Sequence, residues 1–236
     1  MSHDALVFSA GGMWTAWEAG AWSVLADRFR PDLIVGASGG AWNGWAVAGG
    51  ATPEELTRQW LDPALAKVMQ FGLHRRGFLN PAPFLEFSRE LFDRYRPRMS
   101  FALTVVQLPS LRTHIVRDRE ITWKHLAASC AIPFGFPPVE IDGRLYVDGG
   151  LRGGLPLWAA EELGARRALA LNVLTGPVFR ALRTVMRNQA ATNSLQVTLL
   201  EPSRRLGSIR DALVWNPSNV ERWIELGRSD ASSITM

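Results

Sequence analysis

A serine flanked by glycines lies between a buried-strand pattern and a helix pattern, and few folds accommodate that arrangement. The apolar run Leu33–Val35 leads into Gly36-Ala37-Ser38-Gly39-Gly40, and the small residues of 39–48 favour a helix. Glycine lets the backbone turn sharply because it has no Cβ to clash. A serine on such a strand-to-helix turn exposes its hydroxyl above the sheet, as many hydrolase nucleophiles do. The motif predicts an α/β fold with Ser38 as a nucleophile, although the same glycines also suit close packing of a strand on a helix.

Strand and helix patterns alternate along most of the chain, which is typical of a three-layer α/β/α fold with a mainly parallel sheet. A length of 236 residues suits one core, so we expect a single domain over residues 1–236. Residues 62–98 are expected to be helical and irregular. The expected strands are 5–8, 33–35, 101–107, 113–116, 139–141, 144–147, 168–174 and 195–200; the expected helices are 14–25, 39–48, 122–129, 156–163 and 177–191, with others beginning after Asn80 and at capping boxes Thr52–Glu55 and Ser218–Glu221.

The composition narrows the class of protein. Hydrophobic residues make up 47% of the chain and charged residues 20%, as in an ordered globular protein. No apolar stretch approaches the roughly 18 residues that a membrane span needs. The opening residues 1–4 lack the pattern of a signal peptide, which predicts a cytoplasmic protein. Cys130 is the only cysteine, so an internal disulfide and a zinc site built from several cysteines are excluded.

The charged residues leave the nature of an anionic partner open. Lysine and arginine number 26 against 22 acidic residues, and arginine binds phosphate through a planar fork of donors. A net charge of +4 is modest, and arginines on an ordinary solvated surface explain it equally well. On helix 178–191, Arg180, Arg183 and Arg187 share one face. Such a helix can lie on an anionic membrane or simply cover a sheet, and no nucleic-acid partner is expected.

A serine nucleophile needs a base, and the histidines are poorly placed to supply one. In α/β hydrolases the histidine follows the nucleophile and the acid along the chain. No histidine occurs in the 111 residues after His125. His114 and His125 are therefore expected to be structural or surface residues, and the base is expected to be a different kind of side chain.

Asp148 is the best candidate for the base. Residues 139–147 form a hairpin pattern around Asp142-Gly143, a pair that accepts the positive φ of a type I′ turn. Asp148 follows the second arm and precedes Gly149-Gly150, where the backbone can approach a neighbour closely. Asp142 is explained by the turn itself. A strand-end aspartate can also cap a turn, so the assignment of Asp148 as the base depends on its pairing with Ser38.

The loop Ser9-Ala10-Gly11-Gly12 lies between the first strand and the first helix. Successive N–H groups on such a loop can bind an anion. The sequence matches neither nucleotide-binding fingerprint, G-x-G-x-x-G or G-x-x-x-x-G-K-[ST]. We expect this loop to supply oxyanion donors beside Ser38, together with the N–H of Gly39.

Three blocks of the sequence resemble the patatin-like phospholipase family, in the family's order and spacing. Residues 8–20, FSAGGMWTAWEAG, are similar to its glycine-rich opening segment, and residues 36–40 are similar to its nucleophile elbow. Residues 128–150 are very similar to the segment that carries its catalytic aspartate. The resemblance implies a lipid acyl hydrolase that uses a Ser38–Asp148 dyad through an acyl-enzyme, with no metal or organic cofactor.

The similar blocks lie within residues 5–50 and 125–175, and they depart from the family pattern at several positions. Ala10 replaces a glycine, and Trp14 stands where the family has a basic residue. Gly153-Gly154 replaces a pair of asparagines after the aspartate. Backbone donors tolerate the first two changes because an N–H needs no particular side chain. The expected oxyanion hole is formed by Gly11, Gly12, Met13 and Gly39.

The natural substrate and the oligomeric state are not indicated by the sequence. Tryptophans at the starts of the first two helices could line an acyl channel or belong to an ordinary core, and the candidates are Trp14, Trp17 and Trp42. The departures also leave two other functions open. One is a lipid-binding protein that has lost activity, and the other is an acyltransferase in which an alcohol replaces water.

Overall fold

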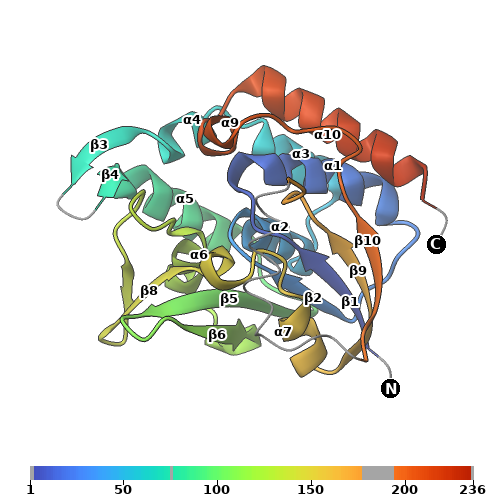
Figure 1. Cartoon of the computed structure of the whole chain (residues 1–236), viewed down its shortest axis with the longest axis horizontal. Helices are drawn as coiled ribbons and strands as arrows, with labels where there is room; N and C mark the ends of the chain where they lie inside the picture. The colour runs from blue at the N-terminus through green and yellow to red at the C-terminus, as the bar shows by residue number, and fades with distance from the viewer. Residues whose placement is uncertain (1–2, 75–76, 177–193, 235–236) are drawn as a thin grey trace.

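The central strands are apolar on both faces, which places them inside a parallel sheet that is covered on both sides. A computed structural model describes residues 3–74, 77–176 and 194–234 (Figure 1). In the described chain the sheet order is β10-β9-β1-β2-β5-β8-β7, and β6 also pairs with β5. The strands are β1 (His3–Phe8), β2 (Leu33–Gly36), β5 (Ser100–Leu108), β6 (Arg112–Arg117), β7 (Val139–Ile141), β8 (Arg144–Asp148), β9 (Ala165–Leu171) and β10 (Gln196–Leu200).

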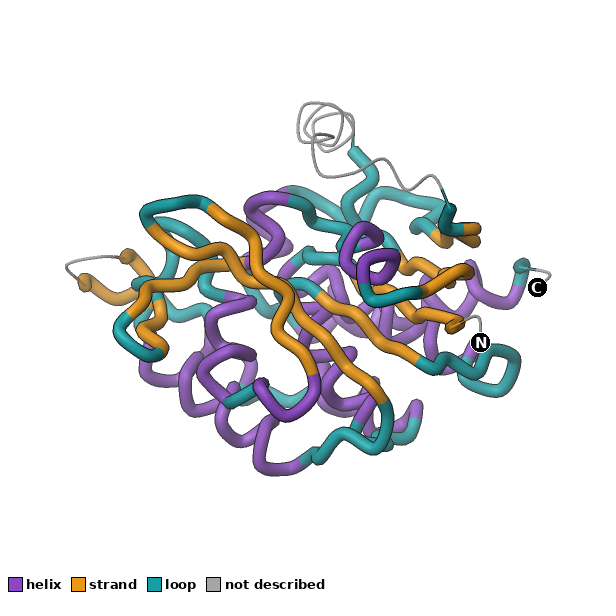
Figure 2. Tube along the Cα trace, turned by 90° about the horizontal axis from the view of Figure 1, so that it is seen from below, coloured by secondary structure: helices purple, strands orange, loops and turns teal. Residues whose placement is uncertain are grey.

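The sheet is parallel from β10 to β5, whereas β6, β7 and β8 run antiparallel to their partners. The mainly parallel α/β architecture expected from the sequence is confirmed. Figure 2 shows the strands as one twisted layer with helices packed against it. The helices are α1 (Ala16–Leu25), α2 (Gly39–Ala48), α3 (Pro53–Trp60), α4 (Leu65–Val68), α5 (Pro81–Arg94), α6 (Trp123–Cys130), α7 (Leu157–Glu162), α9 (Ile209–Leu213) and α10 (Pro217–Ser232), with short 3-10 turns η1 (Gly12–Thr15), η2 (Asp118–Glu120) and η3 (Gly149–Arg152).

Alternate side chains of the central strands belong to two different cores. On β1, Leu6 and Phe8 pack into the larger core with most of the helices, whereas Ala5 and Val7 pack into the smaller core. The smaller core is closed by Ala159 and its neighbours on α7. In Figure 1, α1 and α10 lie above the sheet and α7 lies below it. Side-chain alternation along a strand therefore produces the three layers.

The register of β5 explains how two distant segments meet. Along one edge of β5, residues 102–107 pair with β6. Along the other edge, β2 pairs with residues 100–103 and β8 pairs with residues 105–108. Because β2 is parallel and β8 antiparallel to β5, the two strands run toward each other and end opposite neighbouring β5 residues. The chain segments that follow them are thereby brought together.

Two local expectations were wrong. Residues 62–98 contain a short hairpin, β3 (Phe71–His74) with β4 (Gly77–Leu79), in addition to helices. The C-terminal helix is capped by Asn216, whose side chain accepts from the N–H of Asn219, rather than by Ser218. Pro217 then occupies the first turn, where its missing N–H costs nothing. The expected helix 178–191 lies outside the described residues.

Candidate active site

Ser38 lies on a tight turn between β2 and α2, at the elbow that the sequence predicts. Its φ of 53° and ψ of −132° fall in a region that residues with a Cβ rarely adopt. Strained backbone of this kind is concentrated at functional sites. A Cβ on Gly40 would lie 2.3 Å from the carbonyl oxygen of Ser9, so α2 packs directly on the end of β1. The two strand-to-helix loops of the sequence analysis are therefore neighbours.

Asp148 meets Ser38 where the ends of β2 and β8 converge. The Ser38 hydroxyl donates to Asp148 Oδ2 at 2.7 Å. The other carboxylate oxygen accepts from the N–H of Gly150 at 2.6 Å. Ser38 is 4% exposed and Asp148 is 6% exposed. Two side chains separated by 110 positions in the chain thus form one buried hydrogen-bonded pair.

The surroundings of Asp148 make it a stronger base than an ordinary aspartate. Burial raises its pKa to about 6, while hydrogen bonds from Ser38 and Gly150 act in the opposite direction. A free aspartate has a pKa of about 3.9. Asp148 is therefore mostly ionised at neutral pH and yet basic enough to accept a proton from a hydroxyl.

Asp142, the competing carboxylate, has a conformational role. It occupies the β7–β8 turn with a φ of 49°, followed by Gly143 at 71°, and it is exposed. These positive angles are those of the type I′ turn predicted from Asp142-Gly143.

The two histidines considered as bases have other partners. His114 pairs with Val105 on the sheet, and its ring lies 6.0 Å from that of Tyr146. His125 is on α6, where its Nδ1 accepts from the N–H of Thr122 at 3.1 Å. Neither hydrogen-bonds Ser38 in the described structure. The titratable side chain that accepts the hydrogen bond from the Ser38 hydroxyl is the carboxylate of Asp148.

Ser129 is a residue of the site that the sequence reasoning missed. Its hydroxyl accepts from the N–H of Ser38 at 3.1 Å and donates to the carbonyl of Thr104 at 2.9 Å. It therefore connects the elbow to β5. Ser129 lies in the block that resembles the family, but no feature of the sequence assigns it this contact.

The expected oxyanion donors are arranged around Ser38 on both loops. Gly39 is the first residue of α2 and Gly12 is the first residue of η1, positions whose N–H groups have no partner within the helix. A Cβ on Gly39 would lie 2.9 Å from the carbonyl oxygen of Gly12. Gly12, Met13 and Gly39 border the same cavity as Ser38, whereas Gly11 packs against Val173 and does not border it.

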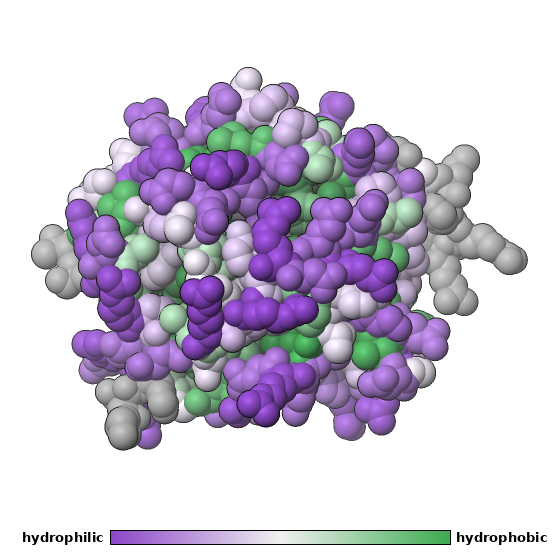
Figure 3. Space-filling view, turned by 180° about the vertical axis from the view of Figure 1, so that it is seen from behind, coloured by the Kyte–Doolittle hydropathy of each residue, from purple (hydrophilic) through white to green (hydrophobic). Residues whose placement is uncertain are grey.

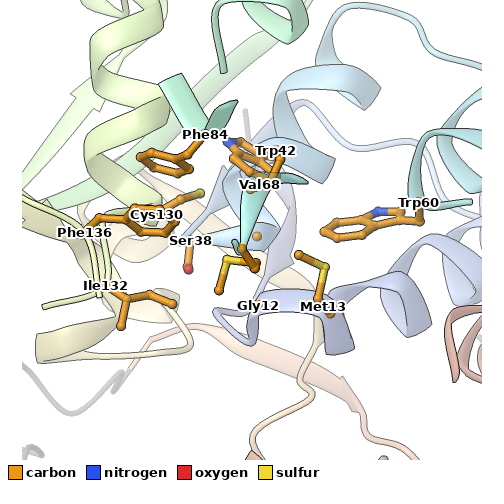
Figure 4. Close-up of a pocket in the computed structure, with 12 residues that line it drawn as sticks. Gly12, Met13, Ser38, Trp42, Trp60, Val68, Phe84, Cys130, Ile132 and Phe136 are labelled. Atoms are coloured by element: carbon orange, nitrogen blue, oxygen red, sulfur yellow. The ribbon is translucent and has the colours of Figure 1, made fainter. Parts of the chain in front are cut away.

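The cavity beside Ser38 is almost entirely apolar (Figure 4). The space between its lining residues is about 330 Å³ including the part that is open to solvent, of which only about 20 Å³ can hold the centre of a water molecule. Cys130 borders it, and burial raises the pKa of its thiol well above the usual range. Phe84 and Phe136 stack with ring centroids 4.1 Å apart. The lining residues are Gly12, Met13, Ser38, Gly39, Trp42, Trp60, Val68, Met69, Phe84, Cys130, Ile132 and Phe136.

Only one of the three tryptophans proposed for substrate binding borders the cavity. Trp42 does, and it packs against Phe84 and Phe87. Trp17 does not, because its indole points across to α10 and donates to Asp230 at 2.9 Å. Trp14 does not either, since η1 directs Met13 into the cavity and leaves Trp14 in the core. Trp14 and Trp17 therefore lie in the core, the alternative that the sequence left open, and neither lines this cavity.

The described part of the chain contains no group of three or more histidine, cysteine, aspartate or glutamate side chains that could hold a metal ion. Within the same residues, no helix has the length and apolar character needed to cross a membrane.

Comparisons with known proteins identify the family and the fold of the chain. The sequence model of the family described as Patatin-like phospholipase matches residues 6–161. The fold is similar to that of VipD from Legionella pneumophila, with a TM-score of 0.59 at 10% sequence identity over 98% of this chain and 66% of that chain. The type III effector protein ExoU gives a TM-score of 0.45 at 13% identity, over 98% of this chain and 52% of that chain.

These comparisons differ in what they establish. At 10% identity the likeness to VipD shows the fold alone. The chain spans about two thirds of the VipD chain and about half of the ExoU chain. No curated protein matches it in sequence. The family model covers well over half of the chain, so this protein belongs to the patatin-like phospholipase family.

Proposed function

We propose that the protein is a lipid acyl hydrolase in which Ser38 and Asp148 form a catalytic dyad. The observation that carries the proposal is the 2.7 Å hydrogen bond from the Ser38 hydroxyl to a buried carboxylate. The apolar residues that line the narrow cavity next to this pair are suited to contact with an acyl chain. A nucleophile, its base and an apolar pocket in contact are the parts that ester hydrolysis requires.

The proposed reaction uses the same two side chains twice. Asp148 accepts the Ser38 proton as Oγ attacks the ester carbonyl, and the N–H groups of Gly12, Met13 and Gly39 stabilise the resulting oxyanion. Collapse of this intermediate expels the alcohol, which takes the proton from Asp148, and leaves an acyl-serine. Asp148 then removes a proton from water, which attacks the acyl-serine. Ser38 Oγ takes this proton from Asp148 as it leaves, so that the fatty acid is released and both side chains return to their starting state.

A labelling experiment tests the assignment of Ser38. A fluorophosphonate probe reacts only with an activated serine, and peptide mapping identifies the modified residue. We expect the label on Ser38 and none after Ser38→Ala. Labelling of another serine, or none in the folded wild type, would exclude the proposed nucleophile and favour a lipid-binding protein. Products formed with an added alcohol separate a hydrolase from an acyltransferase.

The pKa of Asp148 predicts the pH dependence of the reaction. The dyad needs ionised Asp148, and its pKa is raised to about 6. We expect kcat/KM for a dissolved short-chain p-nitrophenyl ester to fall about tenfold per pH unit below pH 6 and to level off above it, since kcat/KM reports the free enzyme. A profile with its midpoint near pH 4 would show that burial does not tune this carboxylate.

We also propose that the protein contacts lipid surfaces through the exposed side chain of Phe134. Phe134 is 85% exposed and has a φ of 67°, a conformation that costs a non-glycine residue about 1–2 kcal/mol. Its neighbours Ile132 and Phe136 line the cavity. Backbone bonds fix the loop, since Phe78 N–H donates to Phe134 O and Gly135 N–H donates to Ile132 O. Phe134 therefore presents an exposed apolar side chain two positions along the chain from residues that line the cavity.

A lipid bilayer would surround the exposed Phe134 ring more favourably than water does, because its acyl chains are apolar like the ring and the cavity lining. Figure 3 shows the face of the molecule that is turned away in Figure 1, which is covered mainly by hydrophilic side chains, with apolar residues in small groups. The expected contribution of Arg180, Arg183 and Arg187 lies outside the described residues and remains a separate proposal.

Replacing Phe134 tests this contact. We expect Phe134→Ser to lower sedimentation with phosphatidylglycerol vesicles several-fold, because a buried phenyl ring contributes about 2 kcal/mol. Leu199→Ser removes an exposed apolar side chain on β10, at the other side of the molecule in Figure 1, and should leave vesicle binding unchanged. Equal binding by wild type and Phe134→Ser would exclude this residue, and the triple Arg→Gln variant would then test the helix.

A further inference from the structure

Glu18 is a completely buried carboxyl group that the proposed reaction does not use. It lies on α1 with 0% exposure, and no ion pair with it is found among the described residues. Burying a carboxyl group is costly unless hydrogen bonds compensate. Glu18 Oε1 accepts from the N–H of Ser9 at 2.8 Å and from its hydroxyl at 2.9 Å, and Oε2 accepts from Asn43 Nδ2 at 3.1 Å.

The partners of Glu18 hold both ends of the glycine loop. Ser9 begins the loop, and its Oγ also accepts from the N–H of Val173 at 3.0 Å. Thr15 ends it: its carbonyl accepts from Asn43 Nδ2 at 2.9 Å, and its hydroxyl donates to the carbonyl of Gly12 at 2.7 Å. The loop residues that border the cavity, Gly12 and Met13, lie between these two attachments.

The same network reaches the nucleophile helix and the cavity wall. Asn43 is on α2, the helix that Ser38 and Gly39 begin. Asn43 Oδ1 accepts from Trp60 Nε1 at 2.7 Å, and Trp60 lines the cavity. One carboxyl group thus connects the glycine loop to the elbow through Asn43 and Ser9.

We propose that Glu18 is a positioning residue that fixes the glycine loop against the nucleophile elbow, so that the N–H groups of Gly12 and Met13 converge with that of Gly39 on the substrate oxyanion. This inference rests on the proposed function. Donors contribute to catalysis only when they are already aimed at the position of the developing charge. A small displacement of one loop relative to the other therefore weakens the transition state more than it weakens substrate binding.

The chemistry of the network explains why the residue is an acid and not merely a polar side chain. Ser9 presents donors to Oε1 and Asn43 presents a donor to Oε2. The orientation of Asn43 is fixed, because its nitrogen must donate to Thr15 O while its oxygen accepts from Trp60. A glutamine at position 18 would place its NH₂ against a donor in either orientation. An ionised carboxylate provides acceptor oxygens on both sides, and the hydrogen bonds from Ser9 and Asn43 act against the burial that raises the pKa of Glu18.

Glu18→Gln tests the inference because it keeps the size of the side chain and changes only the acceptors. We expect kcat for a dissolved p-nitrophenyl ester to fall tenfold to a hundredfold while KM changes less than threefold. The pH midpoint near 6 should persist, since Asp148 is unchanged. A phosphonate or boronate that forms a tetrahedral adduct on Ser38 should bind more weakly, by the same factor as kcat falls, whereas a non-hydrolysable ether analogue should bind equally well.

Asp230→Asn is a matched control. Asp230 is another buried carboxyl group, which accepts from Trp17 Nε1 at 2.9 Å and from the N–H of Ser203 at 3.1 Å. It lies on α10 and is not among the residues that line the cavity. We expect this variant to have a lower melting temperature and an unchanged kcat.

The outcomes are separable. If Glu18→Gln melts at a lower temperature but keeps kcat within twofold of wild type, Glu18 is a packing residue and the inference is wrong. If Glu18→Gln does not fold, Ser9→Ala serves as the second variant, because it removes one hydroxyl group that donates to the Glu18 carboxyl group. An unchanged kcat in Ser9→Ala would also overturn the inference. If wild type does not hydrolyse the ester, or Ser38→Ala still does, the proposed function itself fails and this inference fails with it.

Discussion

Ser38→Ala and Asp148→Asn are each expected to lower kcat by a factor of about 10³ or more, and the double variant should be no slower than the slower single one. The reason is that the two side chains act as one unit, joined by the 2.7 Å bond. Without the hydroxyl there is no nucleophile, and without the carboxylate the hydroxyl keeps its proton. Initial rates with a dissolved p-nitrophenyl ester measure all three variants.

The control for this pair is His125→Ala, which removes a side chain that accepts a hydrogen bond from the N–H of Thr122 at the start of α6. Its kcat should stay within about tenfold of wild type, a difference of 1.4 kcal/mol or less in the transition state. A collapse of activity in His125→Ala, or losses from Ser38 and Asp148 that multiply, would show that they do not form the dyad. Circular dichroism confirms that each variant is folded.

Gly39→Ala is expected to lower kcat by about 10²–10³, as removal of an oxyanion donor typically does. The added Cβ would lie 2.4 Å from Thr15 Oγ1 and 2.9 Å from Gly12 O, so the elbow and the glycine loop must separate. Their N–H groups would then no longer converge on one oxygen. Because Ser38 and Asp148 remain, fluorophosphonate labelling should become slow but still occur at Ser38.

Gly143→Ala distinguishes this effect from a general loss of stability. Gly143 has a φ of 71° but no atom close enough to clash with a Cβ. Its alanine variant should lose about 1–2 kcal/mol of folding free energy through the left-handed backbone alone, with kcat unchanged. If Gly39→Ala retains more than a tenth of the wild-type kcat, the N–H of Gly39 does not stabilise the oxyanion.

Local patterns predicted the parts of the site that depend on local geometry. The sharp turn at Ser38 and the positive φ at Asp142 and Gly143 follow from neighbours in the sequence. The capping box of Thr52 with Glu55 is local in the same way and is confirmed. In each case the residues that impose the conformation lie within a few positions of it.

The parts that sequence reasoning missed depend on distant contacts. Trp17 was expected to face substrate because of its place on the first helix, but its direction is set by Asp230, which lies 213 positions away. Trp60 and Phe84 reach the cavity from segments with no recognisable motif. The meeting of Ser38 with Asp148 was expected from the family resemblance, whereas its cause is the register of two strands on β5. No periodicity in the sequence specifies that register.

The end-to-end arrangement of β2 and β8 on β5 has a consequence for folding. The β7–β8 hairpin has a short turn and can form within microseconds, whereas the pairing of β2 with β5 must close a loop of more than sixty residues. The active site exists only after both have docked on the same edge of β5. Conversely, local opening of β7 and β8 separates the base from the nucleophile while the parallel strands remain paired. Competence for catalysis is thus acquired late in folding and lost early in unfolding.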